Sequence, residues 1–122
     1  MARFKDFEPR GVIPATLLAF NEDFSIDEAA TRQHLRHTAL VRGISAITVN
    51  GHASEVHACN FEEQRLVLDL TMDEIGDDVP IVNGVYADGS QEAARIARMA
   101  DDAGASALLV FPSHSIGRGG GQ

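Results

Sequence analysis

The segment 50–60 holds the residues whose types and spacing best suit chemistry. It reads Asn-Gly-His-Ala-Ser-Glu-Val-His-Ala-Cys-Asn and follows the apolar run 44–49 directly. Small residues in it let backbone amides approach an anion such as a carboxylate, and the imidazole of His52 can donate a hydrogen bond or transfer a proton. The sequence therefore predicts a substrate-binding loop. Its members are Gly51, His52, Ala53, Ser54 and Glu55.

Other interpretations of the same segment compete with this one. His52, Glu55 and His57 could bind a metal, but their spacing within one loop does not enforce a ligand geometry, so we predict no metal and no other cofactor. Ser54 lacks the Gly-x-Ser-x-Gly turn of a hydrolase nucleophile. Glu55 could hold loop amides by hydrogen bonds as readily as it could take part in catalysis. Cys59 is more typical of a small buried apolar residue than of a nucleophile.

Four apolar runs divide the chain and predict parallel strands. Their residues do not alternate with polar ones, which is typical of strands covered on both faces. Between them lie three segments with apolar residues at helical spacing, so the predicted order alternates strand and helix, with strands at both ends. The apolar runs are 12–19, 44–49, 79–82 and 107–111.

Polar pairs and glycines mark the ends of the expected helices. A cap residue followed three positions later by Glu or Gln satisfies free amides of the first turn. The pairs are Ser25 with Glu28, Asn60 with Glu63, and Asp88 with Gln91, with Ser90 as the alternative cap of the third helix. Gly43 and Gly104 are suited to closing the first and third helices in a left-handed conformation.

Two architectures fit this alternation of strands and helices. One is an open doubly wound sheet, and the other is the first half of a (β/α)8 barrel, which needs about 250 residues. Segment 43–49 also resembles segment 104–110, as expected for repeated βα units. In both architectures function gathers at the carboxyl ends of the strands, where segment 50–60 would lie.

Composition narrows the possible partners. The formal net charge of −8 leaves no basic stripe for a nucleic acid, and acidic side chains are repelled by anionic membrane surfaces. The chain has no apolar run long enough to span a membrane and no apolar signal-peptide core. Its single cysteine, Cys59, favours a reducing, cytoplasmic setting.

Taken together in order, these segments resemble the N-terminal half of the dihydrodipicolinate synthase and N-acetylneuraminate lyase family of class I aldolase-type lyases. Segment 11–27 is similar to the family's opening strand and loop, and segment 49–55 stands where the family has Gly-Thr-Thr-Gly-Glu. Segments 61–65 and 79–85 resemble the helix start and the strand that follow. The resemblance implies half of a TIM barrel, with about four parallel strands and three intervening helices in a single truncated domain over 1–122.

The resemblance also implies an activity. A full-length member would join a lysine of its sixth strand to a 2-oxo acid such as pyruvate as a Schiff base, and would form a homo-oligomer, either a dimer or a tetramer. The only lysine here is Lys5, ahead of the first strand, where it is expected to stay solvated and protonated. We therefore expect these 122 residues alone to be inactive.

Departures from the family pattern indicate a divergent branch. His52 and Ala53 stand where the family has two threonines that help to bind the carboxylate of pyruvate. Pro112-Ser113-His114 replaces Pro-Tyr-Tyr, so the interface tyrosine is missing and His114 is the candidate catalytic or interface residue. These changes suggest another 2-oxo acid or carbonyl substrate. The alternative is a degenerate, non-catalytic α/β module that binds a small carboxylate or another chain.

Overall fold

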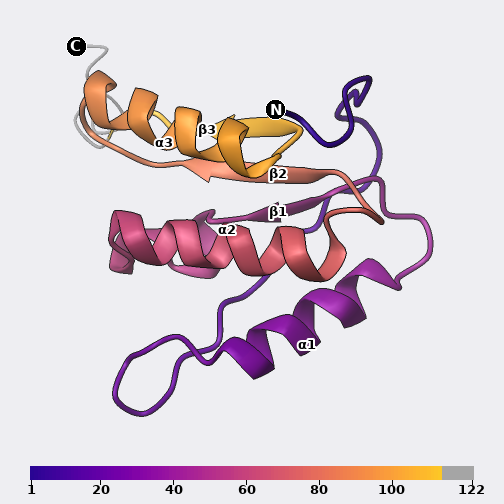
Figure 1. The fold of residues 1–122 in the computed structure, drawn as a ribbon, viewed down its shortest axis with the longest axis horizontal. Helices are drawn as coiled ribbons and strands as arrows, with labels where there is room; N and C mark the ends of the chain where they lie inside the picture. Colours follow the sequence, from indigo (N-terminus) through magenta and orange to yellow (C-terminus); the bar gives the residue numbers. More distant parts are fainter. Residues whose placement is uncertain (114–122) are drawn as a thin grey trace.

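A parallel sheet forms the centre of the computed structural model, which describes residues 1–113. Its strands are β1 (Ile47–Val49), β2 (Ile81–Val85) and β3 (Ala107–Val110), adjacent in that order (Figure 1). Ile47 lies opposite Ile81, and Val82 opposite Ala107, both in parallel register. The prediction of parallel strands in sequential order is confirmed for these three.

The first apolar run is not a regular strand, so the sheet has three strands rather than four. It lies parallel to β1 through two isolated bridges, Val12 with Ile44 and Ala15 with Thr48. These bridges are three residues apart on one segment and four on the other, so the register shifts between them. Pro14 lies within this interval and has no amide hydrogen to donate, although its carbonyl accepts from Thr48 N at 2.9 Å.

Three helices connect these segments: α1 (Glu28–Ala39), α2 (Phe61–Ile75) and α3 (Ser90–Ala103). Within residues 1–113 none of them is long and apolar enough to cross a membrane. The capping box of α2 is confirmed, because Asn60 Oδ1 accepts from Glu63 N at 2.8 Å and Glu63 Oε1 from Asn60 N at 3.0 Å. Gly104 closes α3 with φ of 106°, as predicted.

The predicted caps of the other two helices are wrong. Asp27, not Ser25, caps α1 by accepting from Ala30 N at 3.0 Å. Ser25 belongs instead to the preceding turn, where it donates to Asp23 Oδ1 and lowers the pKa of that carboxyl. At α3 the cap position belongs to Gly89, which has no side chain to accept a hydrogen bond. Helix α1 also ends at Ala39, well before Gly43.

Helix α2 packs against the sheet, and α1 packs against α2. Figure 1 shows α1 on the far side of α2 from the strands. The core between these layers is apolar and includes Leu35, Ile47, Leu68 and Ile81, each no more than 1% exposed. Burial of such side chains supplies most of the free energy of folding, at about 1.5–3 kcal/mol each.

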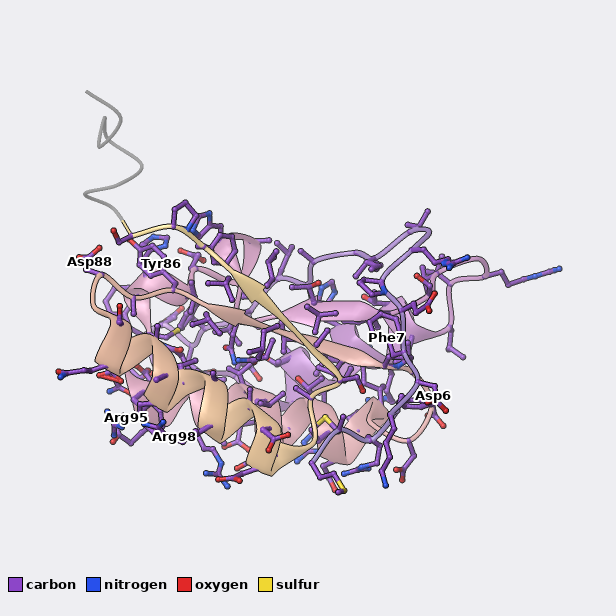
Figure 2. All side chains as sticks on the ribbon, turned by 90° about the horizontal axis from the view of Figure 1, so that it is seen from above. Asp6, Phe7, Tyr86, Asp88, Arg95 and Arg98 are labelled. Carbon is purple, nitrogen blue, oxygen red and sulfur yellow. The ribbon has the colours of Figure 1, made fainter. Side chains whose placement is uncertain are left out.

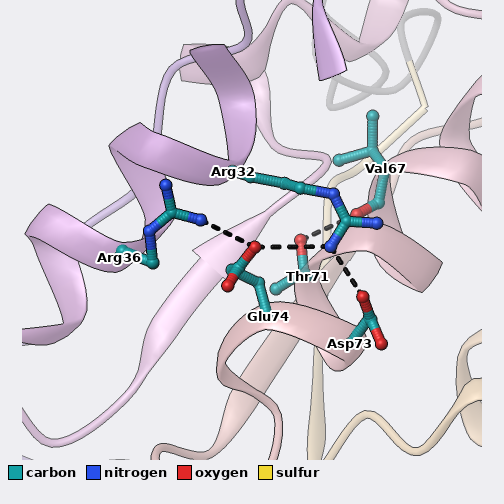
Figure 3. A network of polar contacts seen from close by, with 6 residues as sticks. All are labelled: Arg32, Arg36, Val67, Thr71, Asp73 and Glu74. Carbon is teal, nitrogen blue, oxygen red and sulfur yellow. Dashed lines mark hydrogen bonds and ion pairs between the residues drawn. The ribbon is translucent and has the colours of Figure 1, made fainter. Parts of the chain in front are cut away.

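A network of ion pairs closes the outer rim of the α1–α2 contact (Figure 3). Arg32 donates to Asp73 at 2.6 Å and to Glu74 at 3.3 Å, and Arg36 contacts Glu74 at 2.8 Å. The hydrogen bond to Asp73 raises the pKa of Arg32 above its already high usual value. Arg36 and Asp73 are exposed whereas Arg32 and Glu74 are half-buried, and together the four side chains tie α1 to α2.

The N-terminal segment covers the amino ends of the strands. Arg3 N donates to Gly104 O at 3.0 Å and Phe4 N to Ser106 Oγ at 3.1 Å, just before β3 begins. Lys5 lines a shallow pocket with Pro80, the residue before β2. Figure 2 shows Asp6 and Phe7 of this segment at one end of the molecule and Tyr86 and Asp88 at the other. Lys5 therefore lies at the end of the sheet opposite to the loop that follows β1.

Candidate active site

The loop after β1 consists of two short 3₁₀ turns joined by one left-handed residue. The turns are η1 (His52–Ser54) and η2 (Val56–Ala58), and Glu55 between them has φ of 56°. Asn50, which leads into the loop, also has φ of 56°. These two reversals fold the loop back over the carboxyl ends of the strands.

A buried amide network fixes where this loop starts. Asn50 Nδ2 donates to Asn83 Oδ1 and to Gln64 O, both at 2.9 Å, and Asn83 Nδ2 donates to Gly84 O at 3.1 Å. Asn50 and Asn83 are 1% and 0% exposed, so each bond replaces water that the amide has lost. The network therefore holds the end of β1 on β2.

His52 belongs to an aromatic cluster, which we define as His52, Tyr86 and Phe111. The imidazole stacks on Phe111 with ring centres 4.0 Å apart and planes at 16°. Tyr86 meets the same imidazole edge-on, at 5.5 Å and 79°. Tyr86 directly follows β2 and Phe111 directly follows β3, so the cluster joins the carboxyl ends of all three strands.

The imidazole of His52 is an exposed polar group of this cluster. The side chain is exposed, and within residues 1–113 no hydrogen bond engages its ring nitrogens. A neutral imidazole offers one donor and one acceptor, and a protonated one offers two donors. As far as residues 1–113 are concerned, the carboxyl edge of the sheet therefore holds an imidazole whose nitrogens have no hydrogen-bond partner.

The other predicted loop residues have different surroundings. Ser54 is 3% exposed, and its hydroxyl donates to Thr16 O at 2.6 Å. This bond ties the loop to segment 12–19, the first extended segment of the chain. Gly51 is buried and Ala53 is exposed. Glu55 is exposed and lines a surface pocket of about 490 Å³ together with Phe20 and Phe24, on the side of the first extended segment.

The structure thus gives different surroundings to loop residues that the sequence analysis grouped into one site. His52 lies toward β2 and β3, whereas Glu55 lines a pocket with the loop that precedes α1. Ser54 is a structural tie, because its hydroxyl is buried and already bonded. Gly51, His52 and Ala53 lie at the start of the loop, directly after the end of β1.

Cys59 and the histidines offer no alternative centre in the described part of the chain. Burial raises the pKa of the Cys59 thiol, and the nearby carboxylates of Glu63 and Glu55 raise it further, so the nucleophilic thiolate is disfavoured. No three His, Cys, Asp or Glu side chains within residues 1–113 come together as metal ligands. The remaining candidate, His114, lies outside the described residues.

Sequence reasoning missed Tyr86 and Phe111 as site residues. Each is the first residue after an observed strand, but the predicted apolar runs end at Val82 and at Phe111 itself, so the rule that functional residues follow strand ends did not single them out. The stacking of His52 on Phe111 could not be predicted from the sequence, because it depends on the register that brings Val110 opposite Val85 and on the turn that holds His52.

Comparison with known proteins decides the family. The sequence model of the dihydrodipicolinate synthetase family matches residues 8–114, almost the whole chain. The chain belongs to this family. A 4-hydroxy-tetrahydrodipicolinate synthase of Methanothermobacter thermautotrophicus is 34% identical to it over 101 residues, which are 83% of this chain and 35% of that protein.

Two further relatives show the range of the dihydrodipicolinate synthetase family around this chain. A Streptomyces avermitilis protein named a probable 5-dehydro-4-deoxyglucarate dehydratase is 36% identical over 107 residues, covering 88% of this chain and 32% of that protein. The N-acetylneuraminate lyase from Fusobacterium nucleatum, solved in complex with pyruvate, superposes with a TM-score of 0.78 at 24% identity, over 85% of this chain and 35% of that one. The described fold is therefore part of a TIM barrel, and the chain spans about a third of the length of the curated relatives it matches.

Proposed function

We propose that this chain is the carboxylate-binding, N-terminal part of an aldolase-type lyase that acts on a 2-oxo acid such as pyruvate. The observation that carries the proposal is the exposed imidazole of His52 at the carboxyl edge of the sheet, which makes no hydrogen bond within residues 1–113 and lies next to the small residues Gly51 and Ala53. Membership of the dihydrodipicolinate synthetase family supports it, as does the pyruvate in the Fusobacterium lyase of similar fold.

In the proposed reaction this loop holds the acid while a lysine attacks its carbonyl carbon. The lysine nitrogen forms a bond to that carbon, and the carbonyl oxygen leaves as water to give the imine. Lys5 is the only lysine in the 122 residues and lies at the opposite end of the sheet, so we place the reacting lysine outside this sequence. The role of the described residues is to bind and orient the carboxylate by hydrogen bonds from amides and imidazole.

A second candidate is dehydration of a longer 2-oxo sugar acid within the same family. The Streptomyces relative, which is named a probable 5-dehydro-4-deoxyglucarate dehydratase, is as similar to this chain as the Methanothermobacter synthase is. His52 and Ala53 in place of the two threonines also favour a substrate other than that of the typical synthase. Family membership favours both lyase candidates over a non-catalytic module.

Binding of pyruvate to the chain tests the proposal. We expect the ring signals of His52, in a chain labelled with ¹³C-histidine, to shift and saturate with a dissociation constant of about 1–10 mM, since no covalent bond adds to the affinity. Acetone, which has the carbonyl but no carboxylate, should cause no saturable shift. The five histidines are assigned by single substitutions.

Two variants separate a specific site from general attraction. His52→Gln should weaken pyruvate binding at least about tenfold, because a hydrogen bond to a charged group is lost. Since this variant lacks the His52 ring, the broadening of the pyruvate methyl signal reports binding in both variants and in the unaltered chain. The matched control is His57→Gln, an exposed histidine of the same loop, which should leave the affinity unchanged. Equal effects of the two variants, or no shift of His52 with pyruvate, would contradict the proposed function.

We also propose that the chain associates with further copies of itself. The face of the sheet not covered by helices is apolar and hollowed, with a cavity of about 360 Å³ that Ile13, Val82 and Leu108 help to line. Leu109 and Val110 of β3 are 43% and 64% exposed. An open apolar face next to an unpaired strand favours association. Light scattering should therefore find a dimer or larger species, and a stable monomer at all concentrations would contradict this.

A further inference from the structure

We propose that Phe111 is a positioning residue for His52, holding the imidazole at the carboxyl edge in the orientation in which it meets the acid. The inference rests on the proposed function and extends it to a residue on another strand. Phe111 belongs to the last apolar run of the sequence, and the pattern of that run indicates only a buried strand residue.

The two rings that contact His52 stand at a steep angle to each other, with 72° between the planes of Tyr86 and Phe111. The stack on Phe111, at 4.0 Å and 16°, fixes the plane of the imidazole, and the edge contact of Tyr86, at 5.5 Å and 79°, limits its rotation within that plane. Offset-stacked and edge-to-face geometries are the ones that aromatic quadrupoles favour. Two contacts of this kind define the orientation of a ring that makes no hydrogen bond in residues 1–113.

Phe111 is itself held by the sheet. Its amide donates to Val85 O at 3.0 Å, which continues the β2–β3 ladder one residue beyond Val110. His52, by contrast, lies in a single 3₁₀ turn and is exposed. The ring that the sheet holds therefore orients the exposed ring of the loop, as a supporting residue must if a binding group is to stay within a narrow range of angles.

The stack leaves the ligand-binding atoms of the imidazole free. A face-on contact uses the ring surface, whereas hydrogen bonds to a carboxylate lie in the ring plane. Phe111 can therefore orient His52 without competing for its nitrogens. Loss of the Phe111 ring should accordingly raise the dissociation constant for the acid about fivefold, which corresponds to the typical free energy of one aromatic pair.

Nuclear magnetic resonance of the 122-residue chain provides the test. In the unaltered chain, the ring protons of His52 should show nuclear Overhauser contacts to Phe111 and an upfield ring-current shift relative to those of His57. Phe111→Leu keeps an apolar side chain of similar size but should abolish that shift and weaken pyruvate binding about fivefold. Phe111→Tyr should restore both. Val41→Ala, a change at an exposed apolar residue just after α1, serves as the control and should alter neither.

Each outcome decides one of the two claims. Pyruvate binding that is unchanged in Phe111→Leu would overturn the positioning role while leaving the proposed function intact, and so would a loss that Phe111→Tyr fails to restore. If the unaltered chain binds no pyruvate, the proposed function fails, and the shift of His52 in the two variants still decides whether Phe111 orients it. Should Phe111→Leu not fold, absence of the contacts and of the shift in the unaltered chain would overturn the inference.

Discussion

Replacing Gly84 by alanine is expected to abolish stable folding of the chain. A Cβ atom at position 84 would lie 2.1 Å from the carbonyl oxygen of Asn50 and 2.7 Å from its carbonyl carbon. Both atoms are backbone, and the Asn50 side chain is held in place by Gln64 and Asn83, so the obstacle cannot rotate away. We expect a loss of roughly 3 kcal/mol or more, a large part of the total stability of a small domain.

Gly89→Ala is the matched control for this prediction. Gly89 has φ of −109° and caps α3, and a Cβ atom there would meet nothing within 4 Å. Its replacement should cost about 1 kcal/mol at most. Urea unfolding followed by circular dichroism compares the two variants. A Gly84→Ala chain that unfolds at the same urea concentration as the parent would show that β1 and β2 do not approach as closely as described.

The second large effect is the absence of a covalent adduct. Treatment of the folded chain with pyruvate and borohydride should leave its mass unchanged beyond the background given by the denatured chain. Lys5 is the only lysine and lies beside Pro80, before β2, whereas His52 follows β1 at the other end of the sheet. An amine so far from the proposed carboxylate site gains no effective concentration from binding.

Peptide mapping identifies the site of any adduct that does form. Lys5→Arg removes the only lysine and keeps the positive charge, so a specific adduct on Lys5 would disappear in this variant. Stoichiometric modification of Lys5 in the folded chain, above the denatured background, would contradict the claim that the reacting lysine lies elsewhere.

Local sequence patterns predicted those parts of the fold that depend on local physics. The apolar runs that became β1, β2 and β3 and the Asn60–Glu63 capping box need only near neighbours, and the structure contains them. Ser25 failed as a cap because the turn before α1 uses its hydroxyl for Asp23. The first run failed as a strand because its register with β1 shifts around Pro14, which short-range patterns do not reveal.

The candidate site was predictable in position but not in composition. The sequence placed segment 50–60 after a buried strand, and the structure has it at the carboxyl ends. Which side chains meet there depends on strand register and loop turns, so the stacking of His52 on Phe111 and the bond from Asn50 to Asn83 could not be foreseen. The same turns directed Glu55 to another pocket and buried Ser54.

A crystal structure of the chain soaked with pyruvate tests the central claim most directly, that the loop after β1 binds the carboxylate of a 2-oxo acid. We expect the carboxylate at the carboxyl edge of the sheet, within hydrogen-bond distance of a His52 ring nitrogen and of loop amides near Gly51 and Ala53. Pyruvate found only at the opposite end, beside Lys5, or a loop left empty at saturating pyruvate, would contradict it.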